Sequence, residues 1–193
     1  MNAFIKCKRE GQKNSFMPKI IENLQQRILD TARSEMTEGG YSGLGIRMVA
    51  KKCGIATGTV YNYYPSKEML VAAIMLDDWL LAQKSMREGC AAAADIREGI
   101  GAMFDALCAF KALYSGVWSE YSFTGSTRAI YRDRHVQLIS QLADILGGLL
   151  SRFGAEADAY TRTFVAESLL TAAMEGHPFD KYAAVVSRII DKE

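Results

Sequence analysis

The sequence predicts an all-α protein, with a small N-terminal unit of three helices and a larger helical body, about nine helices in total. Apolar residues recur at spacings of three and four along most of the 193 residues, which is typical of amphipathic helices. The alternating pattern of a strand is not found. A stretch around Gly54 has the spacing of two short helices joined by a tight turn. These observations divide the chain into parts at 1–18, 19–66 and 67–193.

The first predicted helix runs from about Lys19 to Glu38. Its apolar residues recur at every fourth position, at Ile20, Leu24, Ile28, Ala32 and Met36. The pair Gly39-Gly40 follows and is expected to end the helix. Residues 1–18 before it form a basic, polar arm.

The stretch 46–67 is predicted to be a helix, a turn and a second helix. The first helix has one apolar face, made of Ile46, Val49, Ala50 and Cys53. Gly54 supplies the left-handed backbone that a sharp turn requires. The second helix begins near Thr57 and is expected to bury Val60 and Tyr64. This order of a small residue, a glycine and an apolar residue is typical of a helix-turn-helix.

The outward side of that second helix is polar and aromatic. Three pairs one turn apart share it: Thr57 with Tyr61, Gly58 with Asn62, and Thr59 with Tyr63. An ordinary helical hairpin usually carries Glu and Lys on its solvated side, but no acidic residue lies between Arg47 and Lys67. Hydroxyl and amide groups beside a position without a side chain suit a DNA groove. The pattern therefore favours DNA binding.

The run AKKCGIATGTVYNYYPSKEML resembles the DNA-binding domain of TetR-type transcriptional repressors. The matching pieces are V-A-x-x-x-G-I, G-T-V-Y-x-Y-Y and S-K-E-x-L, and the resemblance covers roughly residues 20–75. Three residues depart from the family pattern. Gly45 and Ala56 stand where a capping Ser or Thr is usual, and Glu35 stands where an apolar residue is common. None is expected to meet DNA, so they bear on stability.

The polar stripes and the resemblance together imply roles on DNA. Bases in the major groove are expected to face Thr57, Gly58 and Asn62, with Arg47 reaching a base or a phosphate. Phosphates are expected to be held by Thr59, Tyr61, Tyr63 and Lys67. The arm 1–18 is expected to be a solvated tail, and the alternative is that it reaches phosphate or the minor groove.

Charge is divided unevenly along the chain. Residues 1–67 hold 11 Lys and Arg against 5 Asp and Glu, whereas residues 68–193 hold 12 against 17. A basic N-terminal part on an acidic body suits a DNA-binding module carried by a domain with another task.

The body is predicted to be helical throughout. Ser66 is expected to cap a helix over 67–88 that ends before Gly89, and its apolar run 69–76 predicts burial on several sides. Asp95 and Glu98 form a capping pattern for the next helix. Five more helices are expected over 96–114, 117–123, 126–153, 156–175 and 178–191.

Aromatic and sulfur-containing side chains are concentrated in the body. For any single one a core position is expected, but together they predict an apolar pocket, and the bodies of TetR-type proteins usually bind small molecules. The predicted lining is Trp79, Met86, Met103, Phe104, Leu107, Cys108, Tyr114, Trp118, Tyr121 and His135. Arg132 and Glu120 are further polar candidates. A small, largely apolar or aromatic ligand is expected to bind there and to lower the affinity for DNA.

A homodimer is expected through the last two helices, because one short helix reads few bases and two-fold pairing matches a palindromic site. The expected interface is Phe164, Ser168, Leu169, Ala172, Tyr182, Val185, Val186 and Ile189. The alternative is that these residues only cover the core of one chain.

Patterns of catalysis and metal binding are not found. The four cysteines and two histidines form no cluster, and no nucleophile motif or phosphate loop occurs. The adjacent Asp77 and Asp78 point about 100° apart on a helix, so they do not form a facing acid pair. We therefore expect that the protein is not an enzyme and binds no metal or cofactor. We also expect no membrane span, and the reducing cytoplasm as its location.

The sequence thus favours a ligand-responsive DNA-binding regulator, acting as a repressor. Two alternatives remain open. One is a regulator of the same fold without an inducer, and the other is a helical interaction protein that does not read DNA.

Overall fold

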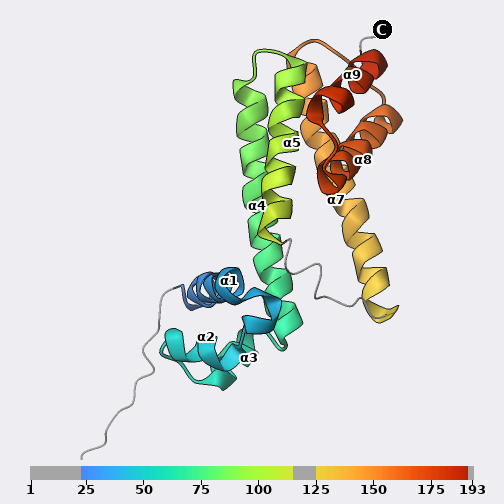
Figure 1. Ribbon diagram of the computed structural model, residues 1–193. Helices are drawn as coiled ribbons and strands as arrows, with labels where there is room; N and C mark the ends of the chain where they lie inside the picture. The colour runs from blue at the N-terminus through green and yellow to red at the C-terminus, as the bar shows by residue number, and fades with distance from the viewer. Residues whose placement is uncertain (1–22, 115–124, 191–193) are drawn as a thin grey trace, which may run out of the picture.

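The computed structural model describes residues 23–114 and 125–190, and of 125–134 only the helical backbone. These residues form eight helices and no strand, which confirms the all-α prediction. The helices are α1 Leu24–Gly43, α2 Ile46–Lys52, α3 Thr57–Tyr63, α4 Lys67–Ala92, α5 Ile96–Leu113, α7 Gly125–Arg152, α8 Ala159–Glu175 and α9 Phe179–Ile190. In Figure 1, α1 to α3 form a head around one end of α4. α5 and α7 pack against the rest of α4, α8 packs on α5 and α7, and α9 packs on α5 and α8, and together they form a body. The arm 1–18, the expected helix start at Lys19 and the expected helix 117–123 lie outside the described residues.

The head is built around the predicted helix-turn-helix. The turn between α2 and α3 is made at Gly54, whose φ of 65° is left-handed, and the Ile55 amide donates to the Ala50 carbonyl at 3.0 Å. Val60 and Tyr64 are buried, as the spacing predicts. They pack with α1, the first turns of α4 and a tyrosine at the end of α5 in one hydrophobic core.

The end of α1 differs from the prediction. The chain bends at Gly40, where φ is 67° and ψ is −172°, but helical turns resume and α1 ends only at Gly43. A glycine can take this backbone conformation without strain, so it allows a kink as readily as an end. Leu44 then returns to the head core, where it is buried.

Helix α4 is longer than predicted. Ser66 caps it as expected, since its Oγ accepts from the Met69 amide at 3.2 Å. The predicted end before Gly89 is wrong, because α4 continues to Ala92. A Cβ at Gly89 would lie 2.5 Å from the Cβ of Ala102 on α5. The glycine therefore permits close packing of two helices and does not mark a helix end.

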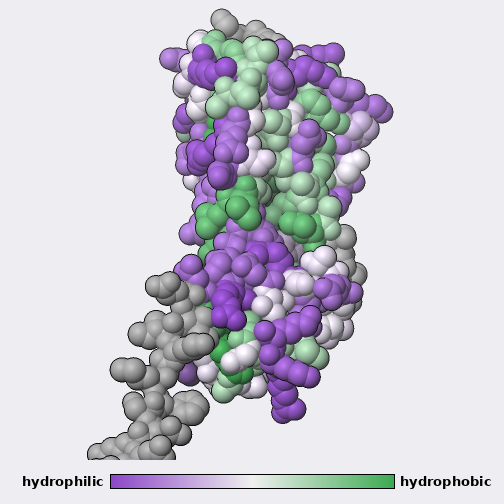
Figure 2. Space-filling model, turned by 90° about the vertical axis from the view of Figure 1, so that its left-hand side faces the viewer, coloured by the Kyte–Doolittle hydropathy of each residue, from purple (hydrophilic) through white to green (hydrophobic). Residues whose placement is uncertain are grey.

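The apolar run 69–76 is not buried on several sides, and that prediction is also wrong. Leu70, Val71 and Ile74 face the core, but Met69 and Leu76 are 54% and 57% exposed. The head and α5 pack against the side of α4 that carries the buried residues. Figure 2 shows hydrophobic residues at the surface near the level where head and body meet.

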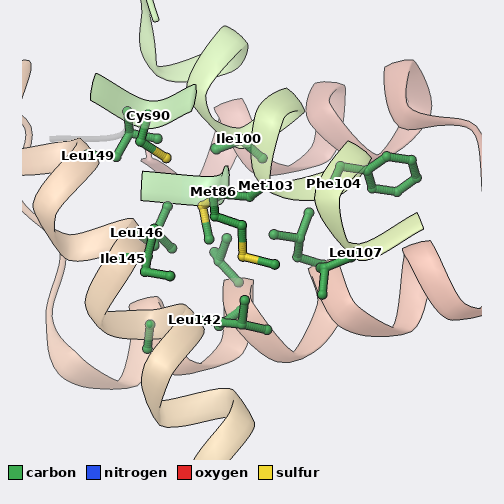
Figure 3. Packing of buried hydrophobic residues seen from close by; sticks show 14 of the residues in the cluster. Met86, Cys90, Ile100, Met103, Phe104, Leu107, Leu142, Ile145, Leu146 and Leu149 are labelled. Carbon is green, nitrogen blue, oxygen red and sulfur yellow. The ribbon is translucent and has the colours of Figure 1, made fainter. Parts of the chain in front are cut away.

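The body core lies between α4, α5, α7 and α8. Figure 3 shows Met86 from α4 and Met103 from α5 close to Leu142 and Leu146 from α7, all fully or almost fully buried. The predicted cap of α5 is confirmed, since the Glu98 amide donates to Asp95 Oδ1 at 2.7 Å. These contacts form a closely packed interior of aliphatic and sulfur-containing side chains.

The last helices are close to their predicted bounds. α7 ends at Arg152, just before Gly154, whose φ is 71°. α8 begins at Ala159 and not at 156, because Asp158 caps it by accepting from the Thr161 amide at 2.6 Å. Among the described residues, no helix is long and apolar enough to cross a membrane.

Candidate nucleic-acid interface

Helix α3 presents most of its side chains to solvent. Val60 alone is buried among its seven residues. Tyr61 and Tyr63 are 47% and 44% exposed, and Gly58 and Asn62 are exposed as well. The predicted groove-facing positions therefore lie on the surface, on a helix held in place by one apolar anchor.

Helix α2 supplies the other side of this surface. Arg47 is exposed, as its predicted role requires, and the neighbouring Met48 is 45% exposed. Sequence reasoning did not select Met48, although it lies next to Arg47 and off the apolar face of α2. An exposed flexible thioether beside a basic residue adds apolar contact area to this surface.

Lys67 is held in place at the start of α4. Its Nζ lies 4.2 Å from the centroid of the Tyr41 ring, a cation–π contact. The Tyr41 hydroxyl donates to the Glu68 carboxylate at 3.2 Å. The Ser66 hydroxyl, the backbone amide of Glu68 and this tyrosine bond lower the pKa of Glu68. The ammonium group of Lys67 is thus oriented before any ligand arrives, which lowers the entropy cost of holding an anion.

The unusual Glu35 has a partner in the head. Its carboxylate forms an ion pair with Lys52 on α2, and that bond raises the pKa of the lysine. The pair joins α1 to α2 at the surface. This ion pair explains why an acidic residue stands at a position where the family pattern is apolar.

A charged cluster joins the head to the body. Arg33 on α1 donates from Nη2 to Asp77 Oδ2 at 2.6 Å and from Nε to Asp78 Oδ1 at 2.8 Å. Asp78 is only 7% exposed, and its other oxygen accepts from the hydroxyl of the fully buried Tyr114 at 2.5 Å. Burial and this carboxylate raise the pKa of Tyr114.

Sequence reasoning treated Asp77 and Asp78 only as possible catalytic acids. Their common partner, Arg33, is 44 residues away from Asp77, so no local pattern indicates the cluster. A buried carboxylate requires such partners, since an unpaired charge in the interior is strongly unfavourable.

The predicted pocket residues fall into four groups. Trp79, Met86, Met103, Phe104 and Leu107 are buried in the body core, with Cys108 half-buried beside them. Tyr114 packs in the head core. His135 is exposed, with Nε2 3.8 Å from Glu167 Oε1. Trp118, Tyr121 and Glu120, and the side chain of Arg132, lie outside the described residues.

Two grooves open on the described part of the body. One of about 320 Å³ lies between α5 and α9 and is lined by Ile100, Phe153 and Val186. The other, of about 430 Å³, lies between α7 and α8 and includes His135, Arg162 and Glu167. Of the predicted pocket residues, only His135 lines either groove. In the described residues no three His, Cys, Asp or Glu side chains are grouped as a metal site.

The predicted dimer residues are also divided. Leu169, Ala172 and Val186 are buried within one chain. The Tyr182 hydroxyl donates to the Val165 carbonyl and lies near Ser168 Oγ, and Ile189 is half-buried. Two predicted residues are well exposed, Phe164 at 50% and Val185 at 56%.

A helix-turn-helix head with an exposed second helix, carried on a separate helical body, defines a class of DNA-binding regulators. Residues 28–74 match the family described as bacterial regulatory proteins, tetR family. The chain is 39% identical over 62 residues to the transcriptional regulator UidR of Escherichia coli K12, 32% of each chain. It is 28% identical over 122 residues to the repressor KstR of Mycobacterium tuberculosis H37Rv, 61% of this chain and 56% of that protein. The head of the chain is thus similar to the DNA-binding part of the tetR family of bacterial regulatory proteins.

Solved structures extend the likeness to the body. Salmonella enterica GusR matches with a TM-score of 0.63 at 20% identity, over 90% of this chain and 99% of that one. AibR, solved with isovaleryl coenzyme A and operator DNA, matches with a TM-score of 0.51 at 19% identity, over 86% and 98%. These likenesses show the fold. The chain spans about a third of the length of the curated relatives it matches first, so the task of the body has to be argued from its own residues.

Proposed function

We propose that this protein is a repressor that binds a palindromic operator as a homodimer and is released by a small, largely apolar molecule. The observation that carries the proposal is the exposed, non-acidic surface of α3 beside Arg47 and Lys67. Thr57, Gly58 and Asn62 face bases, and the flanking hydroxyls with Lys67 hold phosphates. The curated relative KstR is a repressor by name, which supports the direction of regulation.

Binding to the DNA upstream of the protein's own gene tests this proposal, with fluorescence anisotropy at several salt concentrations. Affinity should fall steeply as salt rises, because phosphate contacts release counterions. Lys67→Ala should weaken binding to all sequences alike, whereas Asn62→Ala should change the base preference at one position by ~1–3 kcal/mol. Wild-type affinity in both variants would contradict the assignment of this surface.

The proposed dimer pairs α8 and α9 of two chains, because one short recognition helix reads few bases and two-fold pairing doubles the site. Half-sites about 34–36 Å apart, or a multiple of that distance, would match the DNA repeat. The interface is best tested at Phe164 and Val185, whose side chains are exposed in one chain, and not at Ala172 or Val186, which are buried. Phe164→Glu with Val185→Glu should give a folded monomer by light scattering, and an unchanged dimer would refute this interface.

Release by a ligand requires a mechanical link between the body and the DNA. Helix α4 is that link, since Lys67 at its start lies at the DNA surface while Met86 lies in the body core. The Arg33 cluster with Asp77 and Asp78 fixes the head to α4. A ligand that binds the displaced state a hundredfold better contributes about 2.7 kcal/mol of coupling. Apolar compounds that raise the melting temperature should also weaken operator binding, and stabilisation without that effect would refute the coupling.

A regulator without an inducer is the second candidate. It is favoured by the close packing of Met86, Met103 and Leu107, which are fully buried and leave no opening at their positions in either groove. Under this alternative, a thermal-shift screen would find no stabilising compound, or only compounds that leave operator affinity unchanged. The expected effects of Lys67→Ala and Asn62→Ala on DNA binding would be the same.

A further inference from the structure

Gly58 on α3 has no role in the fold that requires a glycine. It lies in the exposed half of the helix, and a Cβ placed on it would meet no atom within 4 Å. Its φ is not left-handed, because the positive-φ glycines are Gly40, Gly54, Gly154 and Gly176. Neither packing nor backbone geometry within the described residues excludes a larger residue here.

Other glycines of the chain have an internal reason for lacking a side chain. Gly54 adopts a positive φ in the turn. A Cβ at Gly89 or Gly99 would collide with the side chain of Ala102 or of Leu149. Gly58 lacks either reason. The same is true of Gly39, Gly43 and Gly148, but among these four glycines only Gly58 lies on the helix that is proposed to meet DNA.

The glycine also weakens the helix that carries it. Glycine is among the poorest helix formers, because it loses more backbone entropy on folding than alanine does. α3 has only seven residues, and its first flanking residue, Ala56, makes no side-chain capping bond. In the free protein, alanine at position 58 would be the better residue.

We propose that DNA approaches the backbone of α3 at Gly58 to van der Waals contact, so that even a methyl group at this position would be expelled from the groove. The inference rests on the proposed function, because it concerns how the same helix docks. Asn62 lies one turn further along the same stripe, and its amide reaches a base edge only if the helix sits this deep. Gly58 is thus a positioning residue that sets the depth of docking.

Gly58→Ala tests the proposal, since its two effects are opposite in sign. The melting temperature should rise by about 2 °C, because the helix gains propensity without a clash. Operator affinity should fall by about tenfold or more, because an added methyl overpacks a closed interface. A protein that becomes more stable and still binds worse cannot have lost affinity through a damaged fold.

Two control variants isolate the steric cause. Gly148→Ala makes the same change at an exposed position of α7 with equally open space, and should stabilise the protein and leave operator affinity unchanged. Ala56→Ser adds a capping side chain to α3 itself and should not weaken operator binding. This variant tests whether a more stable recognition helix alone lowers the affinity. Equal operator affinity of Gly58→Ala and wild type would overturn this inference alone, whereas a wild-type protein that binds no DNA would overturn the proposed function.

Discussion

The head and the body use exposed and buried residues differently. In the head, α3 buries Val60 and exposes most of its other side chains, which have no packing task. In the body, sulfur-containing residues that the sequence predicts to line a pocket, such as Met86 and Met103, fill the core. The contrast teaches that a residue offers evidence of function when the fold does not need it, as at Asn62 and Gly58.

The junction between the two parts follows a third pattern. Both cores are apolar, yet the contact of α1 with α4 contains a nearly buried carboxylate, Asp78, held by Arg33 and Tyr114. Apolar packing tolerates small shifts, whereas charged bonds of this kind depend on geometry. The junction therefore specifies one orientation of the head on α4.

The largest expected effect separates the body core from the head surface. Leu107→Ala should lower the free energy of unfolding by about 2–5 kcal/mol, because it empties a fully buried site. Tyr61→Ala should change it by no more than about 0.5 kcal/mol and still reduce operator affinity. Urea unfolding at one fixed protein concentration, with operator binding beside it, measures both. If Tyr61→Ala lowered the free energy of unfolding as much as Leu107→Ala does, the contrast between the head surface and the body core would be refuted.

An intermediate effect is expected at the junction. Arg33→Ala leaves the Asp78 carboxylate without its cation and should cost about 2 kcal/mol, less than the roughly 3–5 kcal/mol of a fully buried pair, because Arg33 is 28% exposed. Arg97→Ala breaks a surface pair with Asp180 of the same length, 2.6 Å, as the Arg33–Asp77 bond, and should cost less than about 0.5 kcal/mol. Adding Asp78→Asn to Arg33→Ala should restore part of the loss. Equal costs for the two arginines would show that the junction is no more specific than the surface.

The effect that is smallest at neutral pH is a loss of stability that begins only in alkaline solution. Burial raises the pKa of Tyr182 to about 12, and burial with the bond to Asp78 raises the pKa of Tyr114. The neutral hydroxyls favour the folded state fully below the unfolded pKa of about 10, and this stability is lost as pH rises above it. The free energy of unfolding should fall by up to about 1.4 kcal/mol per pH unit per tyrosine above pH 10.

Chemical denaturation between pH 9 and about pH 11 measures this slope. Tyr182→Phe should remove the part of this pH dependence that arises in the body, and Tyr114→Phe should remove the part that arises at the junction. A slope that neither variant changes would show that these hydroxyls do not link folding to pH.

Much of the head was predictable because its determinants are local. Gly54, Val60 and Ser66 act on residues within one or two turns, so their spacing predicts the turn, the anchor and the cap. Gly89 was misjudged because its reason is Ala102 on another helix. The exposed Met69 and Leu76 were misjudged for a similar cause, since an apolar run does not reveal which of its sides receives neighbours.

The candidate site divides in the same way. The outward residues of α3 follow from helical geometry, and the structure places them on the surface. The Arg33 cluster depends on residues far apart in sequence, and no spacing rule could find it. Whether aromatic residues form a core or a pocket depends on packing density, which composition does not encode.

The close contact of Gly89 with Ala102 affects how far the DNA-facing end of α4 would move if the helix tilted. It brings α4 into close contact with α5 near one end of α4, a helix of 26 residues. Lys67 lies at the other end, roughly 33 Å away at 1.5 Å per residue. With Gly89 as the fulcrum, a tilt of about 5° would carry Lys67 through roughly 3 Å. Because the Tyr114 hydroxyl at the end of α5 bonds to Asp78 on α4, α5 would have to follow such a tilt, so the contact at Gly89 would couple a movement of Lys67 to the packing of the body.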